Sequence, residues 1–301
     1  MTDNHTHRPF GRRGHILGMW LAAIFLFPET IAVAAEAPVH VLVSVAPQAD
    51  FVKHIAGDAA VAEVLVPPGQ SHETYEVTPK QMARIGESQA FFRVGLSIET
   101  GLLPKLQSVC PGLRVVDMRE GVQLLSMGPD SAGHAHGDGM DPHIWLDPVR
   151  VKTQAAAMAA TLSALRPEQA ALFQANLKKF EVALDALTVE LQTTLAPVKG
   201  RTLFVYHPAY GYFADRFGLR QEAVEQEGKD PGLRHVQSVA ESMRKEGARV
   251  LFVQPQFSSK TSEAVAAETG ARVVALDPLP KDYIKDLRGM AQTILEGLRR
   301  D

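Results

Sequence analysis

The sequence contains a single cysteine, Cys110, among its 301 residues. One cysteine permits neither an intrachain disulfide nor a multi-cysteine metal site. Disulfide-free chains of this size are more typical of the periplasm than of small extracellular scaffolds, which depend on disulfides.

Other features are also missing. Basic residues are not in excess: the chain has 31 Lys and Arg and 34 Asp and Glu. The charge balance therefore gives no indication of nucleic-acid binding. Beyond the N-terminal segment, no apolar run reaches the roughly 20 residues that a membrane span needs. The HExxH motif of zinc hydrolases is absent as well. What remains is globular composition, 46% hydrophobic and 22% charged.

The first 35 residues predict a secretory signal peptide. A basic segment comes first, with Arg8, Arg12 and Arg13. The apolar stretch from Ile16 to Phe27 is too short to span a membrane, although an uncleaved anchor is the alternative. We expect cleavage near Ala34 and a periplasmic protein, and the lack of a lipobox cysteine at this point predicts a non-lipidated form.

Strand-like and helical patterns alternate in two blocks. Strand-like runs lie at residues 39–45, 61–66, 90–94 and 113–117, and again at 202–206, 221–225, 249–254 and 272–276. Helical patterns separate them. This alternation is typical of parallel sheets with helices on both faces, so we predict an α/β fold of two Rossmann-like lobes.

A helical region, residues 148–197, joins the two blocks and is divided by Pro167. Proline is favoured in the first turn of a helix, so a new helix should begin at Pro167 and run to about Leu195. About 30 residues correspond to about 45 Å, long enough to act as a rigid connector; a packed helical hairpin is the alternative. The expected domains are residues 36–165, a connecting helix over 166–197, and residues 198–301.

Three histidines stand in similar turn-rich settings, about 70 residues apart: His72 in PPGQSHETYEVTP, His143 in DPHIWLDP and His207 in VYHPAYGYF. Ligands of open α/β sheets bind beyond the carboxyl ends of the strands, and His207 directly follows a strand-like run. Three neutral imidazoles that converge there would form a transition-metal site. Ordinary surface or capping histidines are the alternative.

A fourth candidate ligand is Asp277, which follows the strand-like run of RVVALDPL. It could equally cap the following turn. With three histidines it would complete a His₃Asp set, which suits tetrahedral Zn²⁺ but also accepts Mn²⁺, Fe²⁺, Co²⁺ or Ni²⁺. Carboxylates beside the histidines could orient them; Asp141, Asp147, Glu73 and Glu76 are candidates, each with a cap or a solvated charge as the alternative.

A second, weaker candidate is the loop that contains His134, His136 and Asp138. Short histidine-rich tracts bind metals loosely, so this loop could capture ions and pass them inward. A solvent-exposed loop with incidental histidines explains it equally well.

Together these motifs, with YHPAYGYFADRFGL and EGKDPG, resemble the metal-specific solute-binding proteins of bacterial ABC importers that take up zinc or manganese. The resemblance covers essentially the whole mature chain. It implies two α/β lobes bridged by one long rigid helix, with the metal buried between them. It assigns His72, His143, His207 and Asp277 as ligands. Manganese-type relatives commonly carry a carboxylate where this chain has His207, so the resemblance favours zinc.

The resemblance therefore implies a periplasmic, non-enzymatic carrier of Zn²⁺. Its expected partner is the permease of an ABC importer in the inner membrane, with a periplasmic metallochaperone as a further candidate, and we expect a monomer. A manganese or iron binder of the same fold and, less favoured, a zinc hydrolase are the alternatives. Because a histidine must be neutral to bind metal, affinity should fall steeply below about pH 6.

Overall fold

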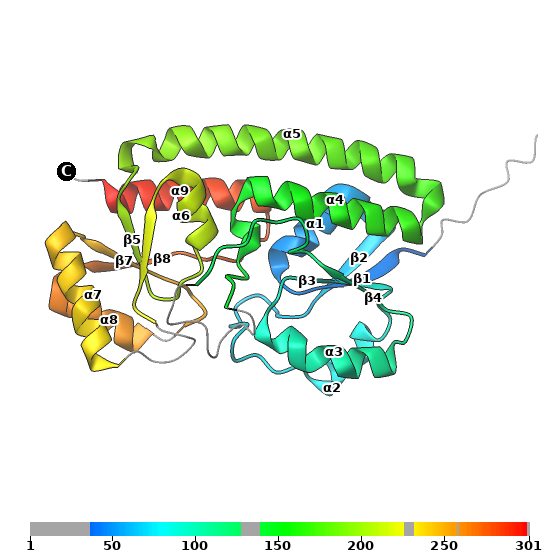
Figure 1. Ribbon diagram of the computed structural model, residues 1–301, viewed down its shortest axis with the longest axis horizontal. Helices are drawn as coiled ribbons and strands as arrows, with labels where there is room; N and C mark the ends of the chain where they lie inside the picture. Colours follow the sequence, from blue (N-terminus) through cyan, green and yellow to red (C-terminus); the bar gives the residue numbers. More distant parts are fainter. Residues whose placement is uncertain (1–36, 128–138, 226–231, 258, 300–301) are drawn as a thin grey trace, which may run out of the picture. The chain divides into compact units, whose positions relative to one another are not determined.

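The computed structural model describes residues 37–127, 139–225, 232–257 and 259–299 of the chain. It contains two four-stranded parallel sheets, each covered by helices (Figure 1). The predicted fold class is confirmed. The N-terminal segment predicted as a signal peptide lies outside the described residues.

The first lobe contains the first sheet. Its strands are β1 (Val39–Val43), β2 (Ala60–Val64), β3 (Ala90–Arg93) and β4 (Arg114–Asp117). Its helices are α1 (Ala46–Ala56), α2 (Pro79–Ile85), α3 (Ser97–Val109) and α4 (Pro148–Leu165). The strand order is β2-β1-β3-β4. β1 is almost wholly buried, as expected for a central strand of a parallel sheet with helices on both faces.

The second lobe repeats this order as β6-β5-β7-β8. Its strands are β5 (Thr202–Val205), β6 (Arg220–Ala223), β7 (Val250–Val253) and β8 (Arg272–Ala275). Its helices are α6 (Gly211–Phe217), α7 (Leu233–Glu246), α8 (Ser259–Thr269) and α9 (Tyr283–Leu298). In each sheet the second strand in the chain pairs with one edge of the first strand, and the third strand pairs with its other edge. The carboxyl ends of β5 and β7 therefore flank a crevice of the kind in which α/β folds bind ligands.

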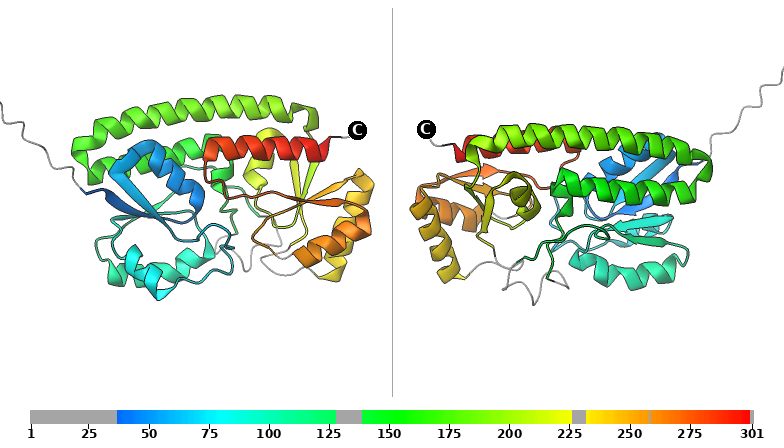
Figure 2. Two further views of the ribbon diagram at one scale, coloured as in Figure 1. Left: turned by 180° about the vertical axis from the view of Figure 1, so that it is seen from behind. Right: turned by 45° about the horizontal axis from the view of Figure 1, so that its top comes forward.

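The predicted long helix is present as α5 (Ala170–Leu195), 26 residues preceded by a 3-10 turn at Pro167–Gln169. It runs alongside α4 and α9 (Figures 1 and 2). Its buried side chains recur every three or four residues, which gives the helix one apolar face. They are Phe173, Leu177, Phe180, Leu184, Leu187, Leu191 and Leu195.

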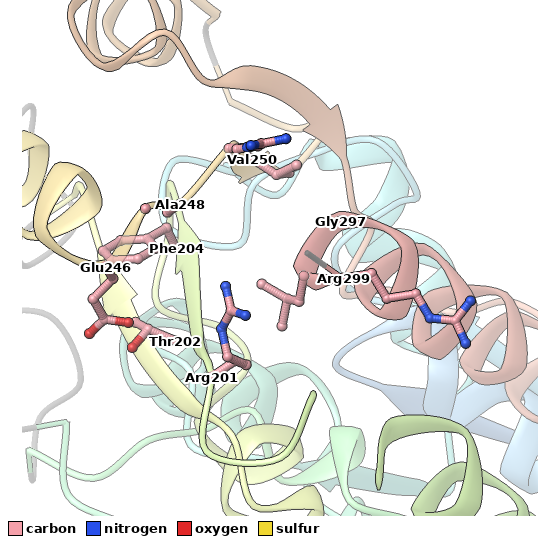
Figure 3. Close-up of a pocket in the computed structure, with 11 residues that line it drawn as sticks. Arg201, Thr202, Phe204, Glu246, Ala248, Val250, Gly297 and Arg299 are labelled. Atoms are coloured by element: carbon pink, nitrogen blue, oxygen red, sulfur yellow. The ribbon is translucent and has the colours of Figure 1, made fainter. Parts of the chain in front are cut away.

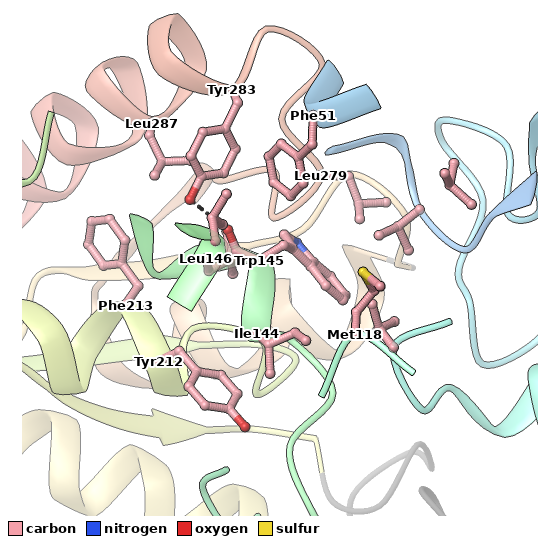
Figure 4. Packing of buried hydrophobic residues seen from close by; sticks show 14 of the residues in the cluster. Phe51, Met118, Ile144, Trp145, Leu146, Tyr212, Phe213, Leu279, Tyr283 and Leu287 are labelled. Carbon is pink, nitrogen blue, oxygen red and sulfur yellow. Dashed lines mark hydrogen bonds between the residues drawn. The ribbon is translucent and has the colours of Figure 1, made fainter. Parts of the chain in front are cut away.

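One hydrophobic core cluster crosses from one lobe to the other (Figure 4), and a smaller cluster lies within the second lobe. Phe51 of α1 meets the ring of Tyr283 at the start of α9 edge-on, with ring centroids 4.9 Å apart. Trp145, which lies between the lobes, donates its Nε1–H to the carbonyl of Pro278 at 2.8 Å. The domain boundaries expected near residues 35, 165 and 197 stay a prediction. Among the described residues, every helix is too short or too polar to cross a membrane.

Candidate metal centre

The structure brings the three predicted histidines together. His72, His143 and His207 are 8%, 0% and 1% exposed, and their ring centroids lie 5.3 to 5.6 Å apart. One ligand atom from each lies within 4.8 Å of the others. Residues far apart in the sequence therefore present imidazole nitrogens to one point.

The separation of the nitrogens fits a small ion. His72 Nε2 lies 3.2 Å from His143 Nε2. Two nitrogens bound to one tetrahedral zinc at about 2.0–2.1 Å lie about 3.3–3.4 Å apart. His207 Nε2 is fully buried and has no hydrogen-bond partner among the described residues. Buried polar atoms are rarely left unpaired, so this lone pair indicates a ligand position.

The ends of two neighbouring strands position His207. It lies two residues beyond β5, at the carboxyl edge of the second sheet. Gln254, one residue beyond the neighbouring strand β7, holds its backbone with two hydrogen bonds. The side-chain Oε1 accepts from the His207 N–H at 3.0 Å, and Nε2 donates to the His207 carbonyl at 2.8 Å. This pair of bonds fixes the backbone at the start of the loop that carries this candidate ligand.

Two of the three rings are oriented by carboxylates. Asp141 Oδ1 lies 2.7 Å from His143 Nδ1, and Glu225 Oε2 lies 2.7 Å from His207 Nδ1. We assign the proton of each ring to Nδ1, because a carboxylate at this distance accepts a hydrogen bond. Nε2 is then the ring nitrogen whose lone pair can bind a metal. A carboxylate behind a histidine is the usual way in which proteins orient metal ligands.

Glu225 is a functional residue that the sequence reasoning missed. Val205 pairs with Ala223 in the sheet, so the residue two positions beyond β6 lies opposite the residue two positions beyond β5. Those residues are Glu225 and His207. This equal offset is visible only once β5 is known to pair with β6, and QEAVEQEGKD contains so many charges that Glu225 does not stand out.

The other candidate carboxylates have different surroundings. Glu73 Oε1 lies 3.8 Å from His207 Nδ1. Burial raises the pKa of Glu73 to about 7, although the charge of His207 opposes this and Glu225 adds to it. Asp147 caps α4 by accepting from the Val149 N–H at 2.9 Å. Glu76 is exposed and lines a separate groove on the first lobe.

Asp277 is not brought to the histidines. Its side chain is exposed, and Oδ1 accepts hydrogen bonds from Gln256 Nε2 at 2.8 Å and from the Leu279 N–H at 3.0 Å. The bond from the Leu279 N–H is the turn cap that the sequence offered as the alternative role of Asp277. β8 is separated from β5 by β7, so Asp277 starts about 10 Å from the strand that carries His207. Its role as a metal ligand stays a prediction.

The second candidate site, His134, His136 and Asp138, lies outside the described residues. Its role also stays a prediction.

Aromatic rings enclose the histidines. Trp145 meets His143 with centroids 5.1 Å apart, and Phe257, which the sequence reasoning did not single out, stacks on His207 at 4.8 Å. Gln70, Ser71, Pro278 and Leu279 complete the lining. The free space beside the histidines is about 10 Å³, close to the smallest space that holds one water molecule. It suits an ion and is too small for an organic molecule.

A different pocket lies at the opposite edge of the second sheet (Figure 3). It is lined by Arg201, Glu246, Arg249 and Arg299 among others, and it contains no histidine. Guanidinium groups repel cations, so this pocket does not compete with the three histidines for a metal.

Comparison with known proteins also indicates a protein that binds zinc. Residues 41–297 match the family model described as zinc-uptake complex component A, periplasmic. The chain belongs to this family. It is 30% identical to the high-affinity zinc uptake system protein ZnuA of Brucella suis biovar 1 (strain 1330), over 94% of this chain and 98% of the relative. A crystal structure of ZnuA superposes with a TM-score of 0.81 at 35% identity, and covers 87% of this chain and 100% of that chain.

A zinc-bound deletion mutant of ZnuA is equally similar, with a TM-score of 0.81 at 35% identity, over 88% of this chain and 99% of that chain. Membership of the family makes the protein a periplasmic solute-binding component of zinc uptake, with Zn²⁺ as its cargo. The zinc assignment expected from His207 is thus confirmed, and the manganese or iron alternative is not favoured.

The carboxylate behind His207 gives a testable prediction. In Glu225→Gln, the imidazole loses a charged acceptor that raises its basicity, so the dissociation constant for zinc should rise about 10–100-fold. Glu222→Gln is the matched control, since Glu222 lies in β6, the strand that Glu225 follows, and accepts from Ser242 Oγ at 2.7 Å. Competitive titration with a fluorescent chelator measures both. Equal affinities in wild type and Glu225→Gln would show that Glu225 does not orient the ligand.

Proposed function

We propose that His72, His143 and His207 hold the zinc ion through their Nε2 atoms. The observation that carries this proposal is the buried Nε2 of His207, which is unpaired among the described residues. The 3.2 Å separation of the other two Nε2 atoms supports it. The carboxylates behind His143 and His207 keep these lone pairs directed into the cavity.

Asp277 remains our proposed fourth ligand. Its support is the adjacent loop, because Pro278 and Leu279 already line the cavity. To coordinate, the carboxylate must exchange its two hydrogen bonds for the metal, and the turn must rotate toward His207. Asp277→Asn tests this, because asparagine still caps the turn but binds zinc weakly. Unchanged zinc affinity in this variant would leave Asp277 as a turn cap alone.

The protein acts as a carrier and not as an enzyme. A hydrolase needs an open metal position and space for a substrate, and a cavity of about 10 Å³ offers no such space. We propose that a monomer delivers the ion to the permease of an ABC importer. A periplasmic metallochaperone could load the site. Release would follow when docking separates ligands of the first lobe from His207.

Competition between metals tests the function. Three imidazoles in a small cavity favour tetrahedral zinc over Mn²⁺, which prefers oxygen ligands in an octahedron. Zinc at 1,000 times its dissociation constant should stabilise the fold by about 4 kcal/mol. Equimolar Mn²⁺ should produce a much smaller shift in the unfolding temperature. A larger shift with Mn²⁺ than with zinc would overturn the proposal.

A further inference from the structure

A partly buried ion pair joins the start of α4 in the first lobe to α6 in the second. Arg216 of α6 donates Nε to Asp147 Oδ1 at 2.9 Å and one terminal nitrogen to Oδ2 at 2.8 Å. Asp147 belongs to the segment that enters α4, and its side chain is 0% exposed. We call Asp147 and Arg216 the interlobe ion pair. A bidentate guanidinium–carboxylate contact fixes direction as well as distance.

Arg150 extends the contact. It donates to Asp147 Oδ2 at 2.5 Å and to Asp215 Oδ2 at 3.3 Å, and its guanidinium group lies 4.7 Å from the centre of the Tyr212 ring. Asp215 and Tyr212 belong to α6, whereas Arg150 belongs to α4. Two guanidinium groups and two carboxylates therefore hold α6 of the second lobe against the first.

Helix α6 also contacts Asp141, the carboxylate that orients His143. Tyr212 donates its hydroxyl to the Asp141 carbonyl at 2.8 Å, and Asp141 Oδ1 is the acceptor behind His143. Gly211, the first residue of α6, makes this approach possible. A Cβ atom at Gly211 would lie 2.6 Å from Asp141 Oδ2. α6 begins four residues after His207, so the helix is connected to one ligand and packed against the support of another.

We propose that Asp147 and Arg216 are positioning residues that set the spacing between His143 and His207. This inference rests on the proposed function of the three histidines. The rings lie 5.3 Å apart, each on a different lobe. A fixed, short spacing fits the four-coordinate zinc ion and works against a cation that needs more ligands and a wider site. The ion pair thus contributes to metal selectivity without touching the metal.

The experiment compares two metals in neutralised variants of the full mature chain. The variants are Arg216→Gln alone, in which Arg150 still pairs with Asp147, and Asp147→Asn with Arg216→Gln, in which no charge of this pair remains. Asparagine keeps the cap of α4. The control is Lys152→Gln with Asp185→Asn, which neutralises a more exposed 2.8 Å pair between α4 and α5.

The readouts are the zinc and Mn²⁺ dissociation constants and the visible spectrum of bound Co²⁺, whose intensity falls when a fourfold site takes more ligands. In both Arg216 variants we expect zinc affinity to fall about 10–100-fold, Mn²⁺ affinity to change by less than about threefold, and the Co²⁺ bands to weaken. The control pair should leave all three readouts unchanged. A lower unfolding temperature with an unchanged ratio of affinities and an unchanged spectrum would overturn the proposal.

Gly211→Ala is an independent probe, because its Cβ pushes on Asp141 while the ion pair remains. It should shift the ratio of zinc to Mn²⁺ affinity in the same direction. Gly289→Ala is the control, since a Cβ at this exposed position of α9 meets nothing within 4 Å. If wild type itself failed to prefer zinc, the proposed function would fail; if wild type prefers zinc and neither probe alters the preference, only the positioning role fails.

Discussion

Replacing His207 by alanine is expected to lower the affinity for zinc by about 10³-fold or more. The loss removes a direct ligand, so it should exceed the 10–100-fold effect of removing a carboxylate behind a ligand. A thousandfold change corresponds to about 4.1 kcal/mol. His143→Ala should have an effect of the same size, because His143 is fully buried and faces His72 at 3.2 Å.

His54→Ala is the matched control. His54 is partly exposed, stacks on Phe180 with ring centroids 4.5 Å apart, and lies away from the cavity. Its removal should leave zinc affinity unchanged. Isothermal titration in competition with a chelator of known affinity measures all three variants. If His207→Ala bound zinc with an affinity within tenfold of wild type, His207 would not be a ligand.

The second large effect is the dependence of zinc binding on pH. Burial lowers the pKa of His207, but its hydrogen bond and charge interaction with Glu225, and then the charges of Glu73 and Asp141, outweigh this and raise the pKa above 6.5. Zinc must displace that proton. Apparent affinity should therefore begin to fall before pH 6.5 is reached from above, and should fall at least about tenfold per pH unit below pH 6.

The metal-free protein should respond to pH in the opposite direction. His207 and Glu73 both have raised pKa values, so the folded state binds more protons than the unfolded state. Stability from such groups is present at low pH and is lost as pH rises through the folded pKa values. For Glu73 that loss runs from about pH 4.5 to about pH 7.

Thermal unfolding with and without zinc from pH 5 to pH 8 separates the two trends. The increase in unfolding temperature caused by zinc should grow with pH. The stability that His207 and Glu73 give to the metal-free protein should decline over the same range. In Glu225→Gln the acid fall of zinc affinity should move to lower pH, because His207 loses the group that raises its pKa. A zinc effect independent of pH between 5 and 7.5 would contradict proton displacement from histidine.

Much of this molecule could be predicted from short-range patterns. All eight strand-like runs correspond to strands, and the helix expected to begin at Pro167 forms a 3-10 turn followed by α5. These features depend on local hydrophobic periodicity and on proline, which the sequence displays directly. The three histidines could also be recognised, because each lies in a distinctive turn-rich segment.

What the sequence did not reveal depends on the order of strands. Glu225 lies beside His207 because β6 pairs with β5, whereas Asp277 lies farther away because β8 pairs with β7. In the sequence, Asp277 directly follows a strand-like run, whereas Glu225 is the last residue of the run 221–225, so only Asp277 attracted attention as a ligand. Phe257 and the interlobe ion pair were missed for a related reason: their partners are 50 or more positions away in the sequence.

The most direct test of the central claim is zinc X-ray absorption spectroscopy of the purified mature protein. We predict three imidazole nitrogens at about 2.0–2.1 Å around one ion, with the remaining position taken by oxygen. His72→Ala, His143→Ala and His207→Ala should each reduce the imidazole count by one or abolish binding. A spectrum with fewer than three imidazoles in the wild-type protein would contradict the account.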